Sequence, residues 1–282
     1  MLRKLLKYEF KATGRSIIPL YGALLILALV IRIFVVNNIN SNFSLLSGNI
    51  NLNLGVLSGL FNALSIFLYG ATMAATAVAT ILIIVYRFYK NLLGDEGYLM
   101  NTLPVSIHSN IVSKIITSIA WCCLSAVIAA ISILIIASNN ISFSNFISDI
   151  FNLLGSAFNA YGFNVPLILL EFVLSGISQI ALNIILIYTS ISLGHMLPKI
   201  KILGSFAAYL AISTAMTIIM TTAASICFRL TSFNLIFERL LSNSPIICTH
   251  IFGTGFFLIN MAWFVILYIT THYILKNKLN LE

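Results

Sequence analysis

The run IVSKIITSIAWCCLSAVIAAISILIIA, residues 111–137, decides the fold class of this chain. Lys114 is its only charged residue, and isoleucine, alanine, leucine and valine dominate the rest. A helix of about 20 apolar residues crosses the roughly 30 Å hydrocarbon layer of a bilayer, where only helices and closed barrels pair all of their backbone groups. Residues 111–137 are therefore predicted to form a transmembrane helix.

The rest of the chain has the same apolar character. Its 282 residues are 60% hydrophobic and 8% charged, with a mean hydropathy of +1.05, which one water-soluble core could not hide. We therefore predict an all-α polytopic membrane protein, surrounded by lipid, in which residues 1–282 form a single transmembrane domain. The six predicted spans are about residues 16–36, 55–86, 111–137, 165–193, 204–228 and 251–275.

Lysine and arginine indicate the orientation of these spans, because cytoplasmic loops retain them. Twelve of the 15 basic residues lie on one side of the predicted spans, and the other three lie toward the opposite side. The twelve are Arg3, Lys4, Lys7, Lys11, Arg15, Arg87, Lys90, Lys114, Lys199, Lys201, Lys276 and Lys278, and the three are Arg32, Arg229 and Arg239. This pattern predicts a multi-pass protein of the cell membrane with both termini in the cytoplasm.

Residues 1–15 are predicted to form a helix that lies in the cytoplasmic membrane interface. Leu2, Leu5, Leu6 and Phe10 fall near one helical face, and lysine and arginine occupy most of the remainder. Such a helix directs its basic side chains toward anionic lipid headgroups. An ordinary positively charged flank without a fixed helix stays open as the alternative.

Two connections on the outer side are also unusual. In residues 143–154, apolar side chains recur at intervals of three and four, which favours an amphipathic helix on the outer surface. The second connection, residues 230–255, is apolar but contains Pro245, Gly253 and Gly255. It is either a re-entrant hairpin, whose irregular backbone must be covered by protein, or a loop on the membrane surface.

The connection YRFYKNLLGDEGYLMNTLPVSIHSNIVSKII, residues 86–116, mixes aromatic and charged residues with two glycines and a proline. It is longer than a turn between two membrane helices requires. We expect the preceding helix to break at Gly94 and Ser106 to cap the helix that follows. A short exposed helix held between two membrane helices could transmit a push from a soluble partner.

Within this connection, the run GDEGYLMNTLPVS, followed by Lys114 and an aromatic-containing third span, resembles type-2 ABC transporter permeases of Gram-positive bacteria. In that family the segment docks on a separate cytoplasmic ATPase subunit. The resemblance implies that ATPase coupling falls on Gly94, Asp95, Glu96, Tyr98, Leu99, Leu103 and Pro104. It also implies two permeases, either two copies or a pair of paralogues, with two ATPases that hold the ATP and Mg²⁺.

Several absences agree with a transport subunit that has no catalysis of its own. The sequence holds no G-x-x-x-x-G-K-[ST] motif, so no phosphate cradle of the usual kind and no cofactor are expected in this chain. No paired catalytic groups and no metal-ligand spacing occur, and the basic residues form no stripe that would suit nucleic acid. Cys227 and Cys248 flank the last outer loop, but the cysteine count does not demand a disulfide.

Three charged residues fall within or at the ends of predicted spans, where ionisable groups are expensive. Glu171 lies near the outer end of the fourth span, and Arg32 and Arg229 lie near the outer ends of the first and fifth. These residues could form a charged outer gate. A structural ion pair, or arginines that reach back to the headgroups, stays open as the alternative.

Small residues recur every four positions along two spans, a spacing that lets helices pack closely in lipid. They are Gly55, Gly59, Ala71, Ala75 and Ala79 in the second span, and Ala207, Ala211 and Ala215 in the fifth. We expect packing within one subunit, while a dimer interface and a translocation path stay open.

Together these features predict the permease subunit of an ATP-binding-cassette exporter. As a whole, the sequence most resembles permeases of peptide or bacteriocin export and immunity systems, including exporters similar to that for phenol-soluble modulins. The resemblance therefore implies an amphipathic or antimicrobial peptide as the cargo. The alternative is an ATP-independent secondary transporter or channel for a hydrophobic small molecule. Such proteins usually place ionisable groups near the middle of the bilayer, and none is predicted there.

Overall fold

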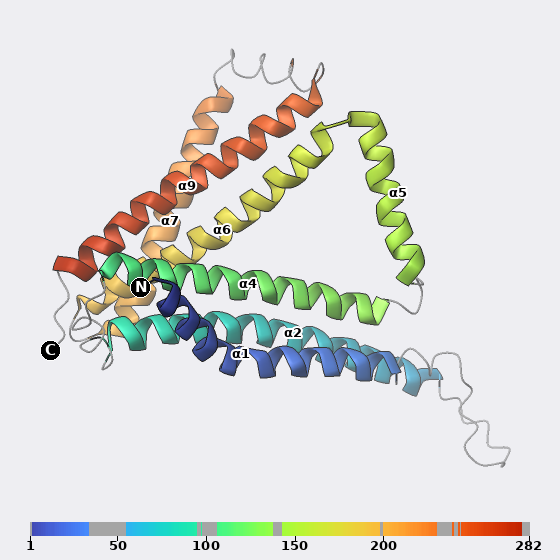
Figure 1. The fold of residues 1–282 in the computed structure, drawn as a ribbon, viewed down its shortest axis with the longest axis horizontal. Helices are drawn as coiled ribbons and strands as arrows, with labels where there is room; N and C mark the ends of the chain where they lie inside the picture. The colour runs from blue at the N-terminus through green and yellow to red at the C-terminus, as the bar shows by residue number, and fades with distance from the viewer. Residues whose placement is uncertain are drawn as a thin grey trace. The chain divides into compact units, whose positions relative to one another are not determined.

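The computed structural model describes residues 2–33, 55–94, 97, 106–137, 143–197, 200–229, 239, 242 and 244–277. Within these ranges the chain forms seven helices whose first and last residues are described. Six of them are long and apolar enough to cross a membrane. The helices are α1 (Leu2–Ile31), α2 (Gly55–Leu92), α4 (Ile107–Ala137), α5 (Phe143–Tyr161), α6 (Asn164–His195), α7 (Lys201–Arg229) and α9 (Pro245–Asn277) (Figure 1). All of them except α5 are membrane-spanning candidates. The prediction of an all-α, multi-pass membrane protein is confirmed.

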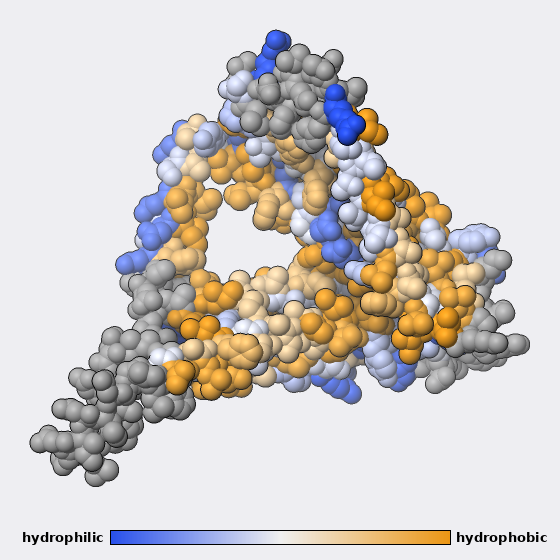
Figure 2. Space-filling view, turned by 180° about the vertical axis from the view of Figure 1, so that it is seen from behind, coloured by the Kyte–Doolittle hydropathy of each residue, from blue (hydrophilic) through white to orange (hydrophobic). Residues whose placement is uncertain are grey.

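Apolar side chains cover much of the helix surface, as Figure 2 shows for one face. Phe67 is 71% exposed and Ile202 is 85% exposed, although both are fully apolar side chains. A water-soluble protein rarely exposes apolar surface on this scale. Lipid is the environment that makes such a surface favourable.

The predicted interfacial helix and the first predicted span belong to one continuous helix. α1 runs without a break from Leu2 to Ile31, and Pro19 lies inside it. Gly14 falls just before the predicted junction, and a Cβ atom there would lie 3.1 Å from Cζ2 of Trp121. Thr13 and Ile17, on either side of the predicted junction, are both buried on the same helical face.

The last span also begins earlier than predicted. α9 starts at Pro245 and includes Gly253 and Gly255, so residues 245–255 are helical and not part of a re-entrant hairpin. Proline suits the first position of a helix, because its fixed φ is helical and its missing N–H is not needed there. The remainder of that predicted hairpin lies largely outside the described residues. The amphipathic helix predicted from residue 143 is present as α5.

The chain divides into two compact units, each with its own packing. The first unit comprises residues 1–9, 85–119 and 154–282, and in it α6 packs against both α7 and α9. Thr189 Oγ1 and Thr271 Oγ1 lie 2.8 Å apart between α6 and α9, and Asn260 donates a hydrogen bond to Ser178. Polar pairs of this kind join helices where no water is present.

The second unit comprises residues 10–84 and 120–153. Ile17, Tyr21 and Trp121 form one buried hydrophobic cluster within it. The Tyr21 hydroxyl donates a hydrogen bond of 3.1 Å to the Trp121 carbonyl, and Tyr69 and Ser132 are joined by a hydroxyl pair at 2.6 Å. These contacts connect α1 and α2 to α4.

The rows of small residues do not pack as expected. Ala207, Ala211 and Ala215 are exposed along α7, and Ala71 and Ala75 are exposed on α2. Close packing between α6 and α7 depends instead on glycine at the end of α6. A Cβ atom on Gly194 would lie only 2.1 Å from Ser205 Oγ, so the two backbones approach each other where that side chain is absent.

Candidate functional site

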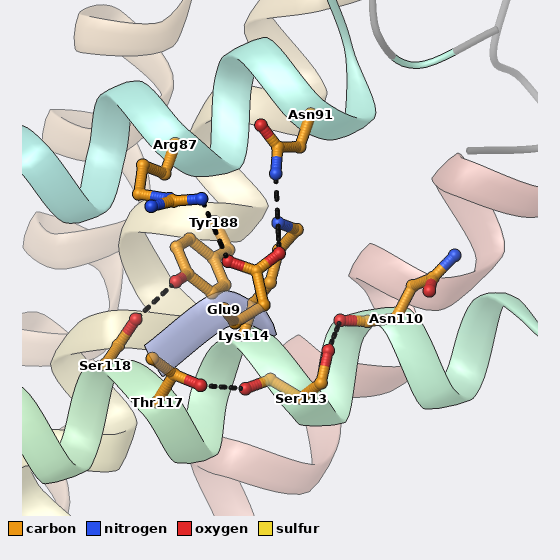
Figure 3. Close-up of polar contacts among 9 residues, drawn as sticks. All are labelled: Glu9, Arg87, Asn91, Asn110, Ser113, Lys114, Thr117, Ser118 and Tyr188. Atoms are coloured by element: carbon orange, nitrogen blue, oxygen red, sulfur yellow. Dashed lines mark hydrogen bonds and ion pairs between the residues drawn. The ribbon is translucent and has the colours of Figure 1, made fainter. Parts of the chain in front are cut away.

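A cluster of charged and polar side chains joins three helices near the ends of α2 and α4. Its centre is Glu9 of α1, whose Oε1 accepts a hydrogen bond of 2.7 Å from Lys114 Nζ in α4 (Figure 3). Arg87 Nη2 lies 3.6 Å from Glu9 Oε2, and Asn91 Nδ2 donates to Glu9 Oε1 at 3.4 Å. We call Glu9, Arg87, Asn91 and Lys114 the Glu9 cluster.

The helical repeat explains how α2 supplies two members of the Glu9 cluster. Arg87 and Asn91 are four residues apart, so both side chains project from the same face of the helix. The side chains of Lys114 and Glu9 are 3% and 9% exposed. A buried charge is costly unless it is paired and hydrogen-bonded, and the Glu9 carboxylate provides that pairing for two cations.

A layer of aromatic and hydroxyl contacts extends the cluster to α6. The ring of Phe88 stacks on that of Tyr188 with their centroids 3.8 Å apart, and both residues are almost completely buried. The Tyr188 hydroxyl lies 2.7 Å from Ser118 Oγ, a hydrogen-bond distance (Figure 3). The single side chain of Tyr188 therefore touches both α2 and α4.

Hydroxyl groups on the same part of α4 bond within their own helix. Ser113 Oγ donates to the Asn110 carbonyl at 2.9 Å, and Thr117 Oγ1 donates to the Ser113 carbonyl at 2.8 Å. Both hydroxyls are thus satisfied although they are buried. The helix face around Lys114 is polar, yet it needs no water to pair these groups.

The two helix ends beside the cluster have the local structure that the sequence predicts. α2 ends at Leu92, and the N–H groups of Leu93 and Gly94 both donate to the Tyr89 carbonyl, so the helix breaks at Gly94 as expected. Ser106 caps α4, because its Oγ accepts a hydrogen bond of 3.3 Å from the Ser109 N–H. The other candidate coupling residues, Asp95, Glu96, Tyr98, Leu99, Leu103 and Pro104, lie outside the described residues.

Of the three charged residues predicted to form a gate, Glu171 meets a side chain on another helix. Glu171 Oε1 lies 2.9 Å from His250 Nδ1, so α6 and α9 are joined by a carboxylate–histidine contact. Arg229 is exposed at the last residue of α7, and Arg32 is half-buried just after the end of α1. The sequence prediction singled out Glu171 but not its partner.

The neighbourhood of Glu171 is tightly packed. A Cβ atom on Gly253 would lie 2.9 Å from Glu171 Oε2, so the absence of a side chain at Gly253 makes room for the carboxylate. Ser175 Oγ donates to the Glu171 carbonyl at 2.6 Å. Glu171 is therefore fixed between α6 and α9.

Sequence reasoning missed Glu9 and the residues that pair with it. The sequence prediction used Arg87 and Lys114 for orientation, and Lys114 also for the resemblance, whereas both lie within membrane-spanning candidates and pair with Glu9. A signal was present, since Glu9 is the only acidic residue before Asp95 and stands among five basic residues. Tyr188 and His250 carried no comparable signal, because their partners lie on helices distant in sequence.

In the described part of the chain, no group of three or more histidine, cysteine or acidic residues could hold a metal ion. Cys248 is a buried free thiol. The cluster offers charge pairing and hydrogen bonding between helices.

No family model, curated protein or solved structure matches this chain.

Proposed function

We propose that this chain is the membrane-spanning permease subunit of an ATP-binding-cassette exporter, energised by a separate cytoplasmic ATPase. One observation carries the proposal. The Glu9 cluster and the Phe88–Tyr188 contact join the end of α2 and the start of α4, which flank the connection of residues 95–105, to α1 and α6.

This arrangement suits the transmission of force. A partner that binds residues 95–105 would displace the ends of α2 and α4, and short buried contacts would carry that displacement into α1 and α6. Buried packed groups move between discrete arrangements and do not deform continuously. A partner that moves this connection can therefore move several membrane helices together.

The proposed orientation puts both termini and residues 95–105 in the cytoplasm, where the ATPase and its ATP and Mg²⁺ are found. The basic residues support this orientation, although Lys114 and Arg87 are paired with Glu9 and are not loop charges. The termini remain strongly basic. Basic segments favour the cytoplasmic side of a membrane.

The surface of α7 supports a proposed cargo path and a second permease. Thr214, Thr217, Thr221 and Thr222 are exposed, and each hydroxyl donates to a carbonyl three or four residues earlier in α7. Their oxygens keep lone pairs that can accept hydrogen bonds from outside the helix. An exposed row of acceptors on a membrane helix suits an amphipathic peptide better than lipid tails.

The docking test uses the full-length chain purified from its own cell membranes. We expect an ABC ATPase to copurify and the complex to hydrolyse ATP. Charge reversal at both Asp95 and Glu96 should abolish this association, whereas the control Asp149→Lys, on exposed α5, should retain it. If the ATPase remains bound and coupled after Asp95, Glu96, Tyr98 and Leu99 are all changed, the proposed docking segment is wrong.

The second candidate is an ATP-independent secondary transporter for a hydrophobic small molecule. The observation that favours it is the Glu171–His250 contact, which places two ionisable side chains within membrane-spanning candidates. Transport into sealed vesicles separates the two functions. Uptake that needs ATP and the copurified ATPase supports the exporter, and uptake driven by a proton gradient without ATP supports the alternative.

A further inference from the structure

Of the seven helices whose bounds are described, α5 alone is not a membrane-spanning candidate. It lies in sequence between two spans, α4 and α6, and is exposed along almost its whole length. Phe151, for example, is 70% exposed. A helix of this composition needs an environment that covers its apolar side chains.

The side chains of α5 separate into two faces. At 100° per residue, the apolar face holds Phe146, Ile147, Ile150, Phe151, Leu154, Phe158 and Tyr161. The opposite face holds Asn145, Ser148, Asp149, Asn152 and Asn159. Asp149 is the only charged residue of the helix, which has no lysine or arginine. Attraction to anionic headgroups therefore cannot position α5, and the apolar face must do so.

The end of α5 is fixed to the start of α6 by a structured corner. Gly162 adopts a positive φ of 57°, a conformation that favours glycine, and its N–H donates to the Phe158 carbonyl at 2.7 Å. The rings of Phe158 and Phe163 pack edge to face, with their centroids 5.8 Å apart. Asn164 Nδ2 donates a hydrogen bond of 3.1 Å to the Tyr161 carbonyl. The corner holds the end of α5 at the level where a membrane span begins.

The other end of α5 is also close to a span in sequence. Residues 138–142 separate Ala137, the end of α4, from Phe143, and these six Cα-to-Cα steps reach at most about 21 Å even when fully extended. Consecutive spans end and begin on the same side of a membrane. Both ends of α5 therefore stay near one membrane surface.

We propose that α5 lies flat in the membrane interface, with its apolar face inserted among the lipid acyl chains and Asp149 in water. The apolar face is covered by the lipid leaflet on the side of the membrane where α4 ends and α6 begins. Because α5 has no basic side chain, this insertion does not depend on anionic lipid. The inference stands independently of the proposed transport function.

The test uses spin labels on the full-length chain in lipid vesicles. The four native cysteines are replaced by serine, and single cysteines are placed at Phe151 or Phe158 on the apolar face and at Asn152 or Asn159 on the polar face. Collisions with oxygen, which concentrates in lipid, are compared with collisions with a water-soluble nickel chelate. Vesicles of phosphatidylcholine alone are compared with vesicles that also contain phosphatidylglycerol.

We expect oxygen to dominate at the apolar positions and the nickel chelate at the polar ones, equally in both kinds of vesicle. Free access of the chelate to all four positions would overturn the inference. Low access of both reagents at Phe151 and Phe158 would also overturn it, since a second copy or another protein would then cover the face. A requirement for phosphatidylglycerol would contradict the charge-independent insertion.

A second measurement keeps the test valid if the cysteine-free variant does not fold. The unmodified chain is reconstituted with a photoactivatable lipid whose reactive group lies near the glycerol backbone, and the cross-linked residues are mapped by mass spectrometry. Cross-links on the apolar face of α5, with none at Asn145, Asn152 or Asn159, support the inference. Cross-links distributed over both faces, or absent from α5, overturn it.

Discussion

Lys114 Nζ donates a hydrogen bond of 2.7 Å to Glu9 Oε1, across 105 positions of sequence and between α1 and α4. Both side chains are buried, so the pair is shielded from water and little screened by salt. A buried ion pair need not add net stability, but the loss of one partner leaves an uncompensated charge. This asymmetry makes the pair suitable for mutagenesis.

Replacement of Glu9 by glutamine should lower the free energy of unfolding by about 3–5 kcal/mol, because Lys114 and Arg87 would lose their buried counter-charge. The measurement is reversible unfolding in mixed micelles, followed by circular dichroism. The matched control Asp149→Asn also converts an acid to an amide, but on exposed α5, and should change little. Partial recovery in the swapped pair Glu9→Lys with Lys114→Glu would confirm direct pairing. An equal loss in Glu9→Gln and Asp149→Asn would contradict it.

The stacked pair Phe88–Tyr188 allows the ring contact and the hydroxyl contact to be separated. Tyr188→Phe keeps the ring and removes the hydroxyl that meets Ser118, and it should cost about 1 kcal/mol. Phe88→Ala removes a fully buried ring and should cost about 3–5 kcal/mol. Unfolding in the same micelles measures both losses. Tyr188→Phe combined with Ser118→Ala should be no worse than the single change, and an additive loss would mean that the two hydroxyls act independently.

The sequence predicts the membrane helices well, because hydrocarbon imposes one strong requirement on the backbone. Apolar runs longer than the bilayer is thick must become helices, and local rules then place the break at Gly94 and the cap at Ser106. α1 is one helix where the sequence predicts an interfacial helix followed by a span. The charge pattern of residues 1–15 suggested an interfacial helix, whereas the burial of Thr13 and Ile17 continues one packed face across the junction.

The cluster could not be predicted in the same way, because its contacts join distant parts of the chain. A lysine in an apolar span signals a buried partner, but the sequence does not say which acid supplies it. The role of one glycine could not be predicted from the sequence for the same reason. Gly194 has no distinctive spacing, and only the position of Ser205 reveals why a side chain is excluded there.

Replacement of Gly194 by alanine should disrupt the junction of α6 and α7, because the new Cβ would lie 2.1 Å from Ser205 Oγ and 2.2 Å from the Ser205 backbone nitrogen. We expect a loss of at least about 3 kcal/mol, comparable to severe overpacking. Gly176→Ala is the control in the same helix, since no atom lies within 4 Å of its Cβ position. That change should be neutral or stabilise α6, because alanine has the higher helix propensity. Similar losses for both variants would show that the contact with Ser205 does not decide the result.

Replacement of Gly253 by alanine should weaken the contact between Glu171 and His250. The added Cβ would lie 2.9 Å from Glu171 Oε2, and the carboxylate must move away from the position in which Oε1 meets His250 Nδ1 at 2.9 Å. The measurement is a double-mutant cycle with Glu171→Gln and His250→Asn, read as unfolding free energy. We expect a coupling energy of about 0.5–1 kcal/mol in the unmodified chain, because the pair is partly exposed.

In the Gly253→Ala background the coupling should fall close to zero, because the two side chains would no longer meet. Gly255→Ala is the matched control, since it adds the same methyl group two residues further along α9, where no atom lies within 4 Å. The coupling should survive that change unaltered. If Gly253→Ala and Gly255→Ala leave the same coupling energy, the space beside Gly253 does not hold the carboxylate in place. If the coupling is absent even in the unmodified chain, α6 and α9 are held together by the hydroxyl and amide pairs deeper in the same interface.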